Sequence, residues 1–250
     1  MKNDLIRTMT YNVWCRKFHE DRIDRVISMI KKYMPDTFGV QEATPAWMEV
    51  LPARLPEYGW VGIGREGEGK GEHMTVFYRK DRFKLLETAT KWLTDTPDEI
   101  SKYAESGCYR VLTYAVLERN SDRKIFVHAN THLDFGVAQE KQAVVLMQLL
   151  EPLKKYPFVL TGDFNCAAGT VPFEHIRSSG LIPSYEFVDK ELNVPTYHGF
   201  RGVEGDRYIM DVCFVPADGV KVQSYRVCNE QIDGDFASDH HPVITDFILS

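Results

Sequence analysis

Short apolar segments rich in β-branched and aromatic residues recur along the chain, and each has the composition of a β-strand. They span residues 6–13, 37–40, 75–78, 111–117, 125–130, 158–160, 209–215 and 243–249. Apolar residues recur at helical spacing in residues 20–34 and 137–153, so we expect amphipathic helices there.

These predicted strands and helices alternate irregularly, and no linker, low-complexity stretch or internal repeat divides them. We therefore expect a single domain over residues 1–250. Residues 91–110 and 182–205 are polar and show no periodic pattern. Loops of that length in a compact domain usually carry function or cover a site.

Composition and charge narrow the possible partners. With 44% hydrophobic residues the chain can build a core, and we expect it to fold alone as a monomer. A formal net charge of −6 disfavours strong, sequence-independent binding to a long nucleic-acid duplex. The five cysteines form neither a CxxC pair nor a zinc-type spacing, so we expect them reduced. No signal-peptide pattern and no run of roughly 18 apolar residues is present, so we expect a cytoplasmic protein without a membrane span.

The glycine-rich segment GIGREGEGKG, residues 62–71, nearly spells two phosphate-binding motifs. Gly71 stands where the GxxxxGK motif needs serine or threonine, and both motifs need a following helix, whereas HMTVFYR predicts a strand. We therefore interpret the segment as a solvated hairpin loop. The sequence also contains no GxSxG or HExxH motif, so serine-hydrolase and zincin chemistry have no support.

The sequence TGDFNC, residues 161–166, places a carboxylate and an amide directly after a buried strand. Residues two apart in an extended chain face the same way, so Asp163 and Asn165 can point into one cleft while Phe164 faces the core. Such a pair can activate a water molecule and hydrogen-bond an oxygen that gains negative charge. The same two residues could instead form only an Asx turn.

Polar residues also end other apolar strands, in MTYNVW, GVQEAT, NTHLDFG, YIMDVCFV and ASDHHPV. Taken singly, Glu42 could cap a helix that begins near Pro45, and His132 could be a satisfied, half-buried histidine. Asp211 interrupts an apolar strand and needs a partner, which His240 or His241 could supply. The combination of these residues at strand ends favours a catalytic site.

Together, MTYNVW, QE, NTHLD, GDFN, the aspartate of MDVCFV and SDHHPV resemble the motifs of the endonuclease/exonuclease/phosphatase superfamily in order and approximate spacing. That superfamily contains deoxyribonucleases, abasic-site endonucleases, inositol-polyphosphate 5-phosphatases and deadenylases. The resemblance covers residues 10–247. It implies an α/β (α+β) fold, a four-layer α/β/β/α sandwich of two mostly antiparallel sheets flanked by helices, with a cleft where the strand ends of both sheets meet.

The resemblance further implies a metal site and a water-activating group. Glu42 would be the principal Mg²⁺ ligand, with Asn12 and Asp239 close to the metal. These residues all offer oxygen, as a hard divalent ion requires. Asp163 would orient or deprotonate the attacking water, and Asn165 would stabilise the pentacovalent phosphorane.

The remaining motif residues would contact the phosphate. By the same resemblance, His132 would bind a phosphoryl oxygen and His240 would lie beside the scissile phosphate, oriented by Asp211. We therefore expect Asp211 and His240 within hydrogen-bonding distance, with His241 at a variable position outside the cleft. Arg110 would hold phosphate through paired hydrogen bonds.

The implied reaction is Mg²⁺-dependent hydrolysis of a phosphodiester or phosphomonoester by in-line attack of an activated water, with Mn²⁺ as a second candidate metal. Nucleic acid, a nucleotide and a phospholipid or inositol-type head group all remain open as substrates. The alternative is a non-catalytic phosphate- or nucleic-acid-binding module on the same fold. A thiol enzyme that uses Cys166 is a further alternative, although no histidine is paired with this cysteine in the sequence.

Overall fold

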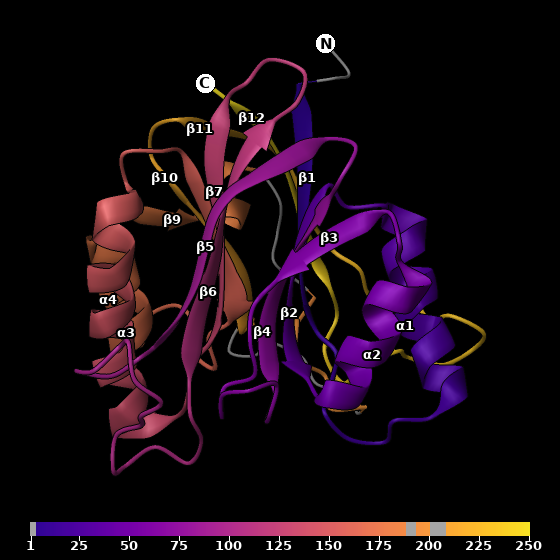
Figure 1. The fold of residues 1–250 in the computed structure, drawn as a ribbon, viewed down its shortest axis with the longest axis horizontal. Coiled ribbons are helices and arrows are strands. Elements are labelled where there is room, and N and C mark those ends of the chain that lie inside the picture. The colour runs from indigo at the N-terminus through magenta and orange to yellow at the C-terminus, as the bar shows by residue number, and fades with distance from the viewer. Residues whose placement is uncertain (1–3, 189–193, 201–208) are drawn as a thin grey trace.

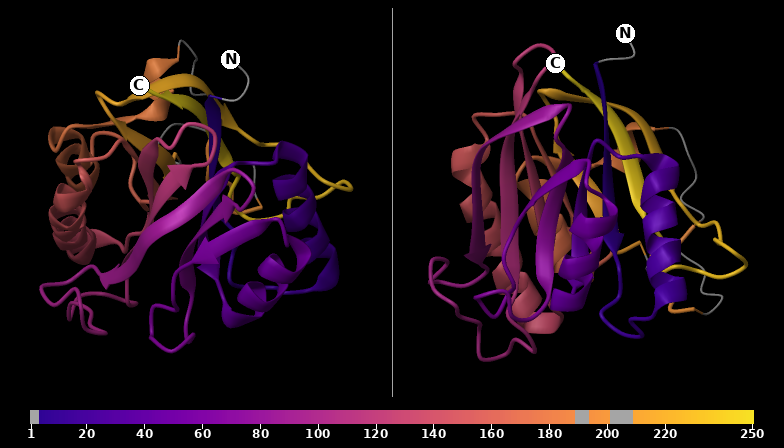
Figure 2. Two further views of the ribbon diagram at one scale, coloured as in Figure 1. Left: turned by 45° about the horizontal axis from the view of Figure 1, so that its top comes forward. Right: turned by 45° about the vertical axis from the view of Figure 1, so that its right-hand side comes forward.

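The structure, a computed structural model, describes residues 4–188, 194–200 and 209–250. Two β-sheets lie face to face, and helices cover the outer face of each sheet (Figure 1 and Figure 2). The four-layer α/β/β/α sandwich implied by the resemblance is therefore confirmed. Within the described residues, no helix is long and apolar enough to cross a membrane.

The first sheet is covered by helices α1 (Glu20–Tyr33) and α2 (Pro45–Arg54). In spatial order its strands are β11 (Val220–Val227), β12 (Val243–Leu249), β1 (Leu5–Asn12), β2 (Thr37–Ala43), β4 (His73–Arg79) and β3 (Tyr58–Val61). Strands β1 and β2 are parallel, and the other neighbours are antiparallel.

The second sheet is covered by helices α3 (Gly136–Leu150) and α4 (Val171–Ser178). Its strands in spatial order are β5 (Phe83–Trp92), β6 (Val111–Arg119), β7 (Ile125–His132), β8 (Phe158–Asp163), β10 (Asp211–Pro216) and β9 (Leu181–Pro183). Strands β7 and β8 form its parallel pair. Two short 3₁₀ helices, η1 and η2, span Glu151–Leu153 and Ser184–Phe187.

All the predicted strands and both predicted helices are present, with ends shifted by a few residues. The strands that the sequence pattern missed are β3, β5, β9 and β11, which form the two edges of each sheet. An edge strand has one paired neighbour and is partly exposed, so its apolar pattern is weak. In β5, for example, only the first and last residues, Phe83 and Trp92, are buried.

The two missed helices have weak sequence signals for different reasons. Helix α2 contains Pro52 and buries only Trp47 and Leu51, so its apolar face is narrow. Helix α4 is eight residues long, which is too short for a clear helical period.

The interface between the sheets contains a buried polar network centred on Asn130 of β7. Its amide nitrogen donates to the carbonyl oxygens of Val40 at 2.9 Å and Thr75 at 3.2 Å, both in the first sheet. Its amide oxygen accepts hydrogen bonds from Gln41 Nε2 at 2.6 Å and Thr161 Oγ1 at 3.1 Å. Because a buried amide is costly unless its hydrogen bonds are made, this network favours one position of β2 against β7 and β8.

Gly39 of β2 leaves the space that this network occupies. A Cβ atom at position 39 would lie 2.3 Å from Asn130 Oδ1 and 2.5 Å from Thr161 Oγ1. Both distances are shorter than van der Waals contact, so a side chain here would force the two sheets or the network apart.

We therefore predict that Gly39→Ala lowers the free energy of unfolding by about 1–3 kcal/mol, the usual cost of overpacking a core. Gly107→Ala is the matched control, because the nearest atom to its added Cβ would be 3.8 Å away. It should change the free energy of unfolding by about 0.5 kcal/mol or less. Urea unfolding followed by circular dichroism measures both, and equal losses would contradict the prediction.

Candidate active site

Three of the predicted site residues lie side by side at the ends of neighbouring strands. Parallel pairing of β7 with β8 sets His132 beside Asp163, and antiparallel pairing of β8 with β10 sets Asp163 beside Asp211. All three side chains are buried. The register of the second sheet therefore brings together residues that are distant in the sequence.

A tight turn after β8 positions Asn165. This residue has a left-handed φ of 50°, and its backbone N–H donates to Asp163 Oδ1 at 2.9 Å. The Asx turn considered above is therefore present. The Asn165 side chain nevertheless donates to His132 Nε2 at 3.0 Å and to the Leu133 carbonyl at 2.9 Å. Phe164 is buried in the core as expected, but the turn, not strand alternation, gives Asp163 and Asn165 their common orientation.

Glu42 lies at an irregularity of the first sheet. The pairing of β2 with β4 shifts between Val40 and Ala43, and Glu42 has a left-handed φ of 59°. A non-glycine residue in this conformation costs about 1–3 kcal/mol and persists where its surroundings hold it. The N–H of Cys15 donates to Glu42 Oε2 at 3.0 Å, so this carboxylate does not cap α2, whose N-cap residue is Thr44.

Asn12 joins the two sheets behind the residues that line the cleft. Its Nδ2 donates to Glu42 Oε1 and to Asp163 Oδ2, each at 3.0 Å. Glu42 belongs to the first sheet and Asp163 to the second. One buried amide therefore sets the separation of the two carboxylates.

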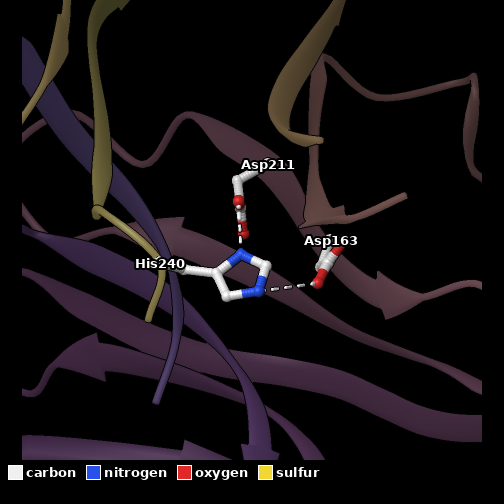
Figure 3. A group of neighbouring side chains, drawn as sticks. All are labelled: Asp163, Asp211 and His240. Atoms are coloured by element: carbon white, nitrogen blue, oxygen red, sulfur yellow. Dashed lines mark hydrogen bonds and ion pairs between the residues drawn. The ribbon is translucent and has the colours of Figure 1, made fainter. Parts of the chain in front are cut away.

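His240 lies between the two aspartates of the second sheet (Figure 3). Its Nδ1 donates to Asp211 Oδ2 at 2.8 Å, and its Nε2 lies 3.7 Å from Asp163 Oδ2. The expected contact between Asp211 and His240 is therefore present. His241 instead stacks on His198, with ring centroids 4.2 Å apart.

The charges of this group follow from its burial and its neighbours. Burial by itself would lower the pKa of His240, but Asp211 and Asp163 raise it to about 10, so the imidazole is cationic at neutral pH. Burial and the nearby Asp211 raise the pKa of Asp163 to about 7, although His240 and Asn12 oppose the shift. A carboxylate with such a pKa is well matched to accepting a proton near neutral pH.

The pKa values of His132 and Glu42 are both lowered, so that the first side chain is neutral and the second is anionic at neutral pH. Burial, with Arg110 and His240 nearby, lowers the pKa of His132 well below its ordinary value, so this imidazole is neutral. Burial would raise the pKa of Glu42, but hydrogen bonds from the Cys15 backbone and from Asn12 outweigh it and lower the pKa. Glu42 is therefore an anion at neutral pH.

Most of the predicted site residues line one cavity of about 400 Å³, namely Glu42, Arg110, His132, Asp163, Asn165, Asp239 and His240. Asn12 and Asp211 are fully buried and contact this group from behind. Arg110 is also buried, with Nη2 3.6 Å from Asp134 Oδ1, while its Nε and Nη1 have no hydrogen-bond partner among the described residues. The predicted residues thus converge from both sheets on one cleft.

The model of the endonuclease/exonuclease/phosphatase family matches residues 9–240. This chain belongs to that family. Members of the family hydrolyse phosphoester bonds and generally depend on a divalent metal. No curated protein sequence matches the chain.

Solved structures of other family members are similar over almost the whole chain. A family protein from Bacteroides thetaiotaomicron is 27% identical, with a TM-score of 0.90 and 98% of each chain covered. The mannosyl-6-phosphatase of the same organism is also 27% identical, with a TM-score of 0.88, 98% of this chain and 100% of that chain covered. The human Nocturnin catalytic domain is 21% identical, with a TM-score of 0.79, and the match covers 99% of this chain and 94% of that chain. At this identity the similarity shows the fold alone.

The donor set in the cleft fits the divalent metal on which the family generally depends. Glu42 and Asp239 line the same cavity, and burial together with the nearby charge of Glu42 raises the pKa of Asp239. Two carboxylates that repel each other across a cleft are stabilised by a cation between them. Asp163, Asp211 and His240 also lie close enough to hold an ion, but there the protonated imidazole already supplies the positive charge.

The sequence patterns missed several other residues that line the cavity, including Trp14, Arg16, Phe135 and Tyr197. They also missed Arg65, which belongs to the segment 62–71 interpreted above as a solvated loop, and Glu72, which directly follows it. That interpretation is wrong for Arg65. Arg65 is buried and binds Glu72, whereas Glu68 and Lys70 at the tip of the loop are exposed. No local pattern of residues marks Arg65 as buried, because its burial depends on contacts with Glu72 and Trp92.

Cys166 does not have the properties of a catalytic thiol. All five are free, and Cys166 is buried. Burial raises the pKa of Cys166 to about 12, so its reactive thiolate is scarcely populated at neutral pH. This finding disfavours the thiol-enzyme alternative.

We predict that His240 titrates near pH 10 in the metal-free protein and that Asp211→Asn lowers this pKa, because the substitution removes the anion that stabilises the imidazolium. NMR of the imidazole proton shifts, with His240→Gln to assign the signal, measures both values. Asp246→Asn is the matched control, since that carboxylate binds Arg7, and it should leave the His240 pKa unchanged. Titration of wild-type His240 near its ordinary value would contradict the prediction.

Proposed function

We propose that this chain is a divalent-metal-dependent phosphoesterase in which Asp163 activates the attacking water. The observation that carries the proposal is the setting of Asp163. Its carboxylate opens on the cavity, accepts a hydrogen bond from Asn12, and lies 3.7 Å from a cationic His240. Its pKa is raised to about 7, so the carboxylate is a stronger base than an ordinary aspartate and can take a proton from water near neutral pH.

Three side chains supply hydrogen-bond donors for the phosphate. The Asn165 amide lines the cavity, where it donates to the Leu133 carbonyl and to His132 Nε2; a phosphoryl oxygen would replace His132 Nε2 as its second acceptor. Arg110 lines the cavity, and its Nε and Nη1 have no hydrogen-bond partner within residues 4–188, 194–200 and 209–250. His240 adds a positive charge beside Asp163. A donor that is oriented in advance stabilises charge that develops in the transition state.

Glu42, Asn12 and Asp239 are the residues that would hold Mg²⁺ or Mn²⁺. When bound, the cation supplies Lewis-acid stabilisation of charge on the phosphoryl oxygens. Glu42 is the principal ligand in this proposal because its carboxylate is ionised, held by two hydrogen bonds and directed by a strained backbone.

A small phosphomonoester is the substrate class that the comparisons favour. Among the similar structures at 27% identity is a mannosyl-6-phosphatase, which acts on a phosphomonoester. The cavity volume of about 400 Å³ lies within the range of small-molecule sites. The net charge of −6 agrees with this choice, because it disfavours strong, sequence-independent binding to a long nucleic-acid duplex. A nucleotide or a short single strand is the second candidate.

The metal assignment predicts that Glu42→Gln abolishes most phosphate release and weakens Mg²⁺ binding, because a neutral amide replaces the principal anionic ligand. The fold should persist, since Glu42 lines an open cavity. Glu49→Gln on the exposed surface of α2 is the matched control. Phosphate release across a Mg²⁺ series, with EDTA as the blank, and calorimetry of Mg²⁺ binding test the assignment. Wild-type activity of Glu42→Gln at limiting Mg²⁺ would refute it.

The roles of Asp163 and Asn165 predict losses in turnover with little change in substrate binding. Asn165→Ala should lower kcat by roughly 10²–10³, the usual effect of removing one oriented donor, and Asp163→Asn by at least as much. Asn165→Gly separates catalysis from the turn, because glycine tolerates the left-handed backbone but lacks the amide.

Kinetics with a phosphomonoester and thermal unfolding of the three variants distinguish the two roles. If Asn165 serves only the turn, Asn165→Gly should keep wild-type kcat, and Asn165→Ala should lose only thermal stability. That result would remove Asn165 from the proposed mechanism.

A further inference from the structure

Arg65 and Glu72 form a buried ion pair in the wall of the active-site cavity. Arg65 Nη1 lies 2.6 Å from Glu72 Oε2, and Arg65 Nη2 lies 3.1 Å from Glu72 Oε1, so both arms of the guanidinium meet both carboxylate oxygens. The side chains are 10% and 15% exposed. A paired geometry of this kind is the most strongly oriented contact that these two residues can make.

The surrounding loop holds this pair rigidly. The backbone of Arg65 pairs with Glu72, and its carbonyl accepts a 2.8 Å hydrogen bond from Trp92 Nε1. Gly64 allows the hairpin to close, because a Cβ atom there would lie 2.0 Å from the Lys70 carbonyl oxygen. The loops that join β3 to β4 and β5 to β6 lie together at the end of the sandwich opposite the two termini (Figure 1).

The pair is electrically neutral but is still able to form hydrogen bonds. Arg65 Nη1 and Nη2 each carry a second N–H besides the one directed at Glu72, and each Glu72 oxygen can accept more than the one hydrogen bond it receives from Arg65. Both residues line the cavity, so a ligand there can use these remaining groups. The matching ligand group is one that accepts and donates at the same atom, which is a hydroxyl.

Arg110, in the same cavity, is suited to a different ligand group. Its Nη2 lies 3.6 Å from Asp134 Oδ1, and in the part of the chain that the structure describes two of its nitrogens have no hydrogen-bond partner, so its positive charge is only loosely compensated. An uncompensated guanidinium favours an anion, whereas the Arg65–Glu72 pair favours a neutral polar group. The cavity therefore offers one position for phosphate and another for hydroxyls.

An apolar surface completes the cavity. Phe135, which directly precedes α3, lines the cavity and is 62% exposed as a residue, and Trp14 lines it as well. Aromatic rings provide an apolar face and leave polar groups free to bond elsewhere. A sugar ring matches this combination, because it presents C–H groups on its faces and hydroxyls at its edge.

We propose that the Arg65–Glu72 pair selects the leaving group of the substrate, that this group is a compact polyol of the hexose type, and that the substrate is a sugar phosphate. This proposal rests on the phosphoesterase function proposed above. Arg65 and Glu72 are specificity-determining residues in this view and take no part in the bond-breaking step. A site built to hydrogen-bond hydroxyls discriminates strongly against analogues that lack them.

The test compares wild type and Glu72→Gln on D-mannose 6-phosphate and p-nitrophenyl phosphate with Mg²⁺. Glu72→Gln keeps the size of the side chain but removes the charge that orients Arg65. The ratio of kcat/KM for the hexose phosphate to kcat/KM for the aryl phosphate should fall about tenfold or more, as expected for losing a hydrogen bond to a charged group. Glu68→Gln, at the exposed tip of the same loop, should leave this ratio unchanged.

A binding measurement separates recognition from catalysis. Calorimetry with D-mannose 6-phosphate on metal-free Asp163→Asn protein should show binding, and adding Glu72→Gln should weaken it about tenfold or more. If Glu72→Gln lowers kcat/KM equally for both substrates and leaves their ratio unchanged, the specificity role of the pair is overturned. Preference of wild type for a dinucleotide over hexose phosphates would overturn the sugar assignment and leave the phosphoesterase function standing. Absence of metal-dependent phosphate release from every substrate would instead refute the proposed function itself.

Discussion

The buried side chain of Asn130 is the contact on which the geometry of the cleft depends. It joins β2 and β4 of one sheet to β7 and β8 of the other. Asn130 lies two residues before His132, and its partner Thr161 lies two residues before Asp163. Since residues two apart on a strand face the same side, the network lies one layer beneath the site. Because these hydrogen bonds set the position of one sheet against the other, they also set the distances between the catalytic groups at the strand ends.

The charged groups of the site stabilise one another, and they come from both sheets. Asp163 and Asp211 belong to adjacent strands, and two buried carboxylates so close would repel each other. The cationic His240, delivered by the loop before β12, compensates them. Asn12 then ties this group to Glu42 across the cleft. The ionisation of each residue is therefore a property of the assembled pair of sheets.

The division between strand ends and loops has a functional meaning. Groups proposed for the reaction lie at strand ends and in the turns next to them, where hydrogen-bonded register fixes them. The Arg65–Glu72 pair, proposed for specificity, lies on a hairpin at the rim of the same cavity. A fold can change such loops without disturbing the chemistry beneath them, which is how one scaffold serves many substrates.

Much of the fold could be predicted from the sequence, because strands buried on both sides are rich in apolar and β-branched residues. This is why β1, β7, β8 and β12 were predicted, whereas the edge strands were not. In β11 the alternation of buried Val220 and Val222 with exposed Lys221 and Gln223 is a strand pattern that could have been recognised. In β5 no such pattern exists, because its stability comes from pairing with β6.

The sequence by itself determined which chemical groups are available, since carboxylates, amides and histidines placed after apolar runs indicate a hydrolytic site whatever the fold. The choice of His240 over His241 as the partner of Asp211 came from the family resemblance, and the structure gives the reason: only His240 reaches the cleft, while His241 stacks on His198. Burial of Arg65 and the strained backbone of Glu42 were decided only by tertiary structure. These features depend on contacts between segments far apart in the chain, and no local pattern of residues encodes such contacts.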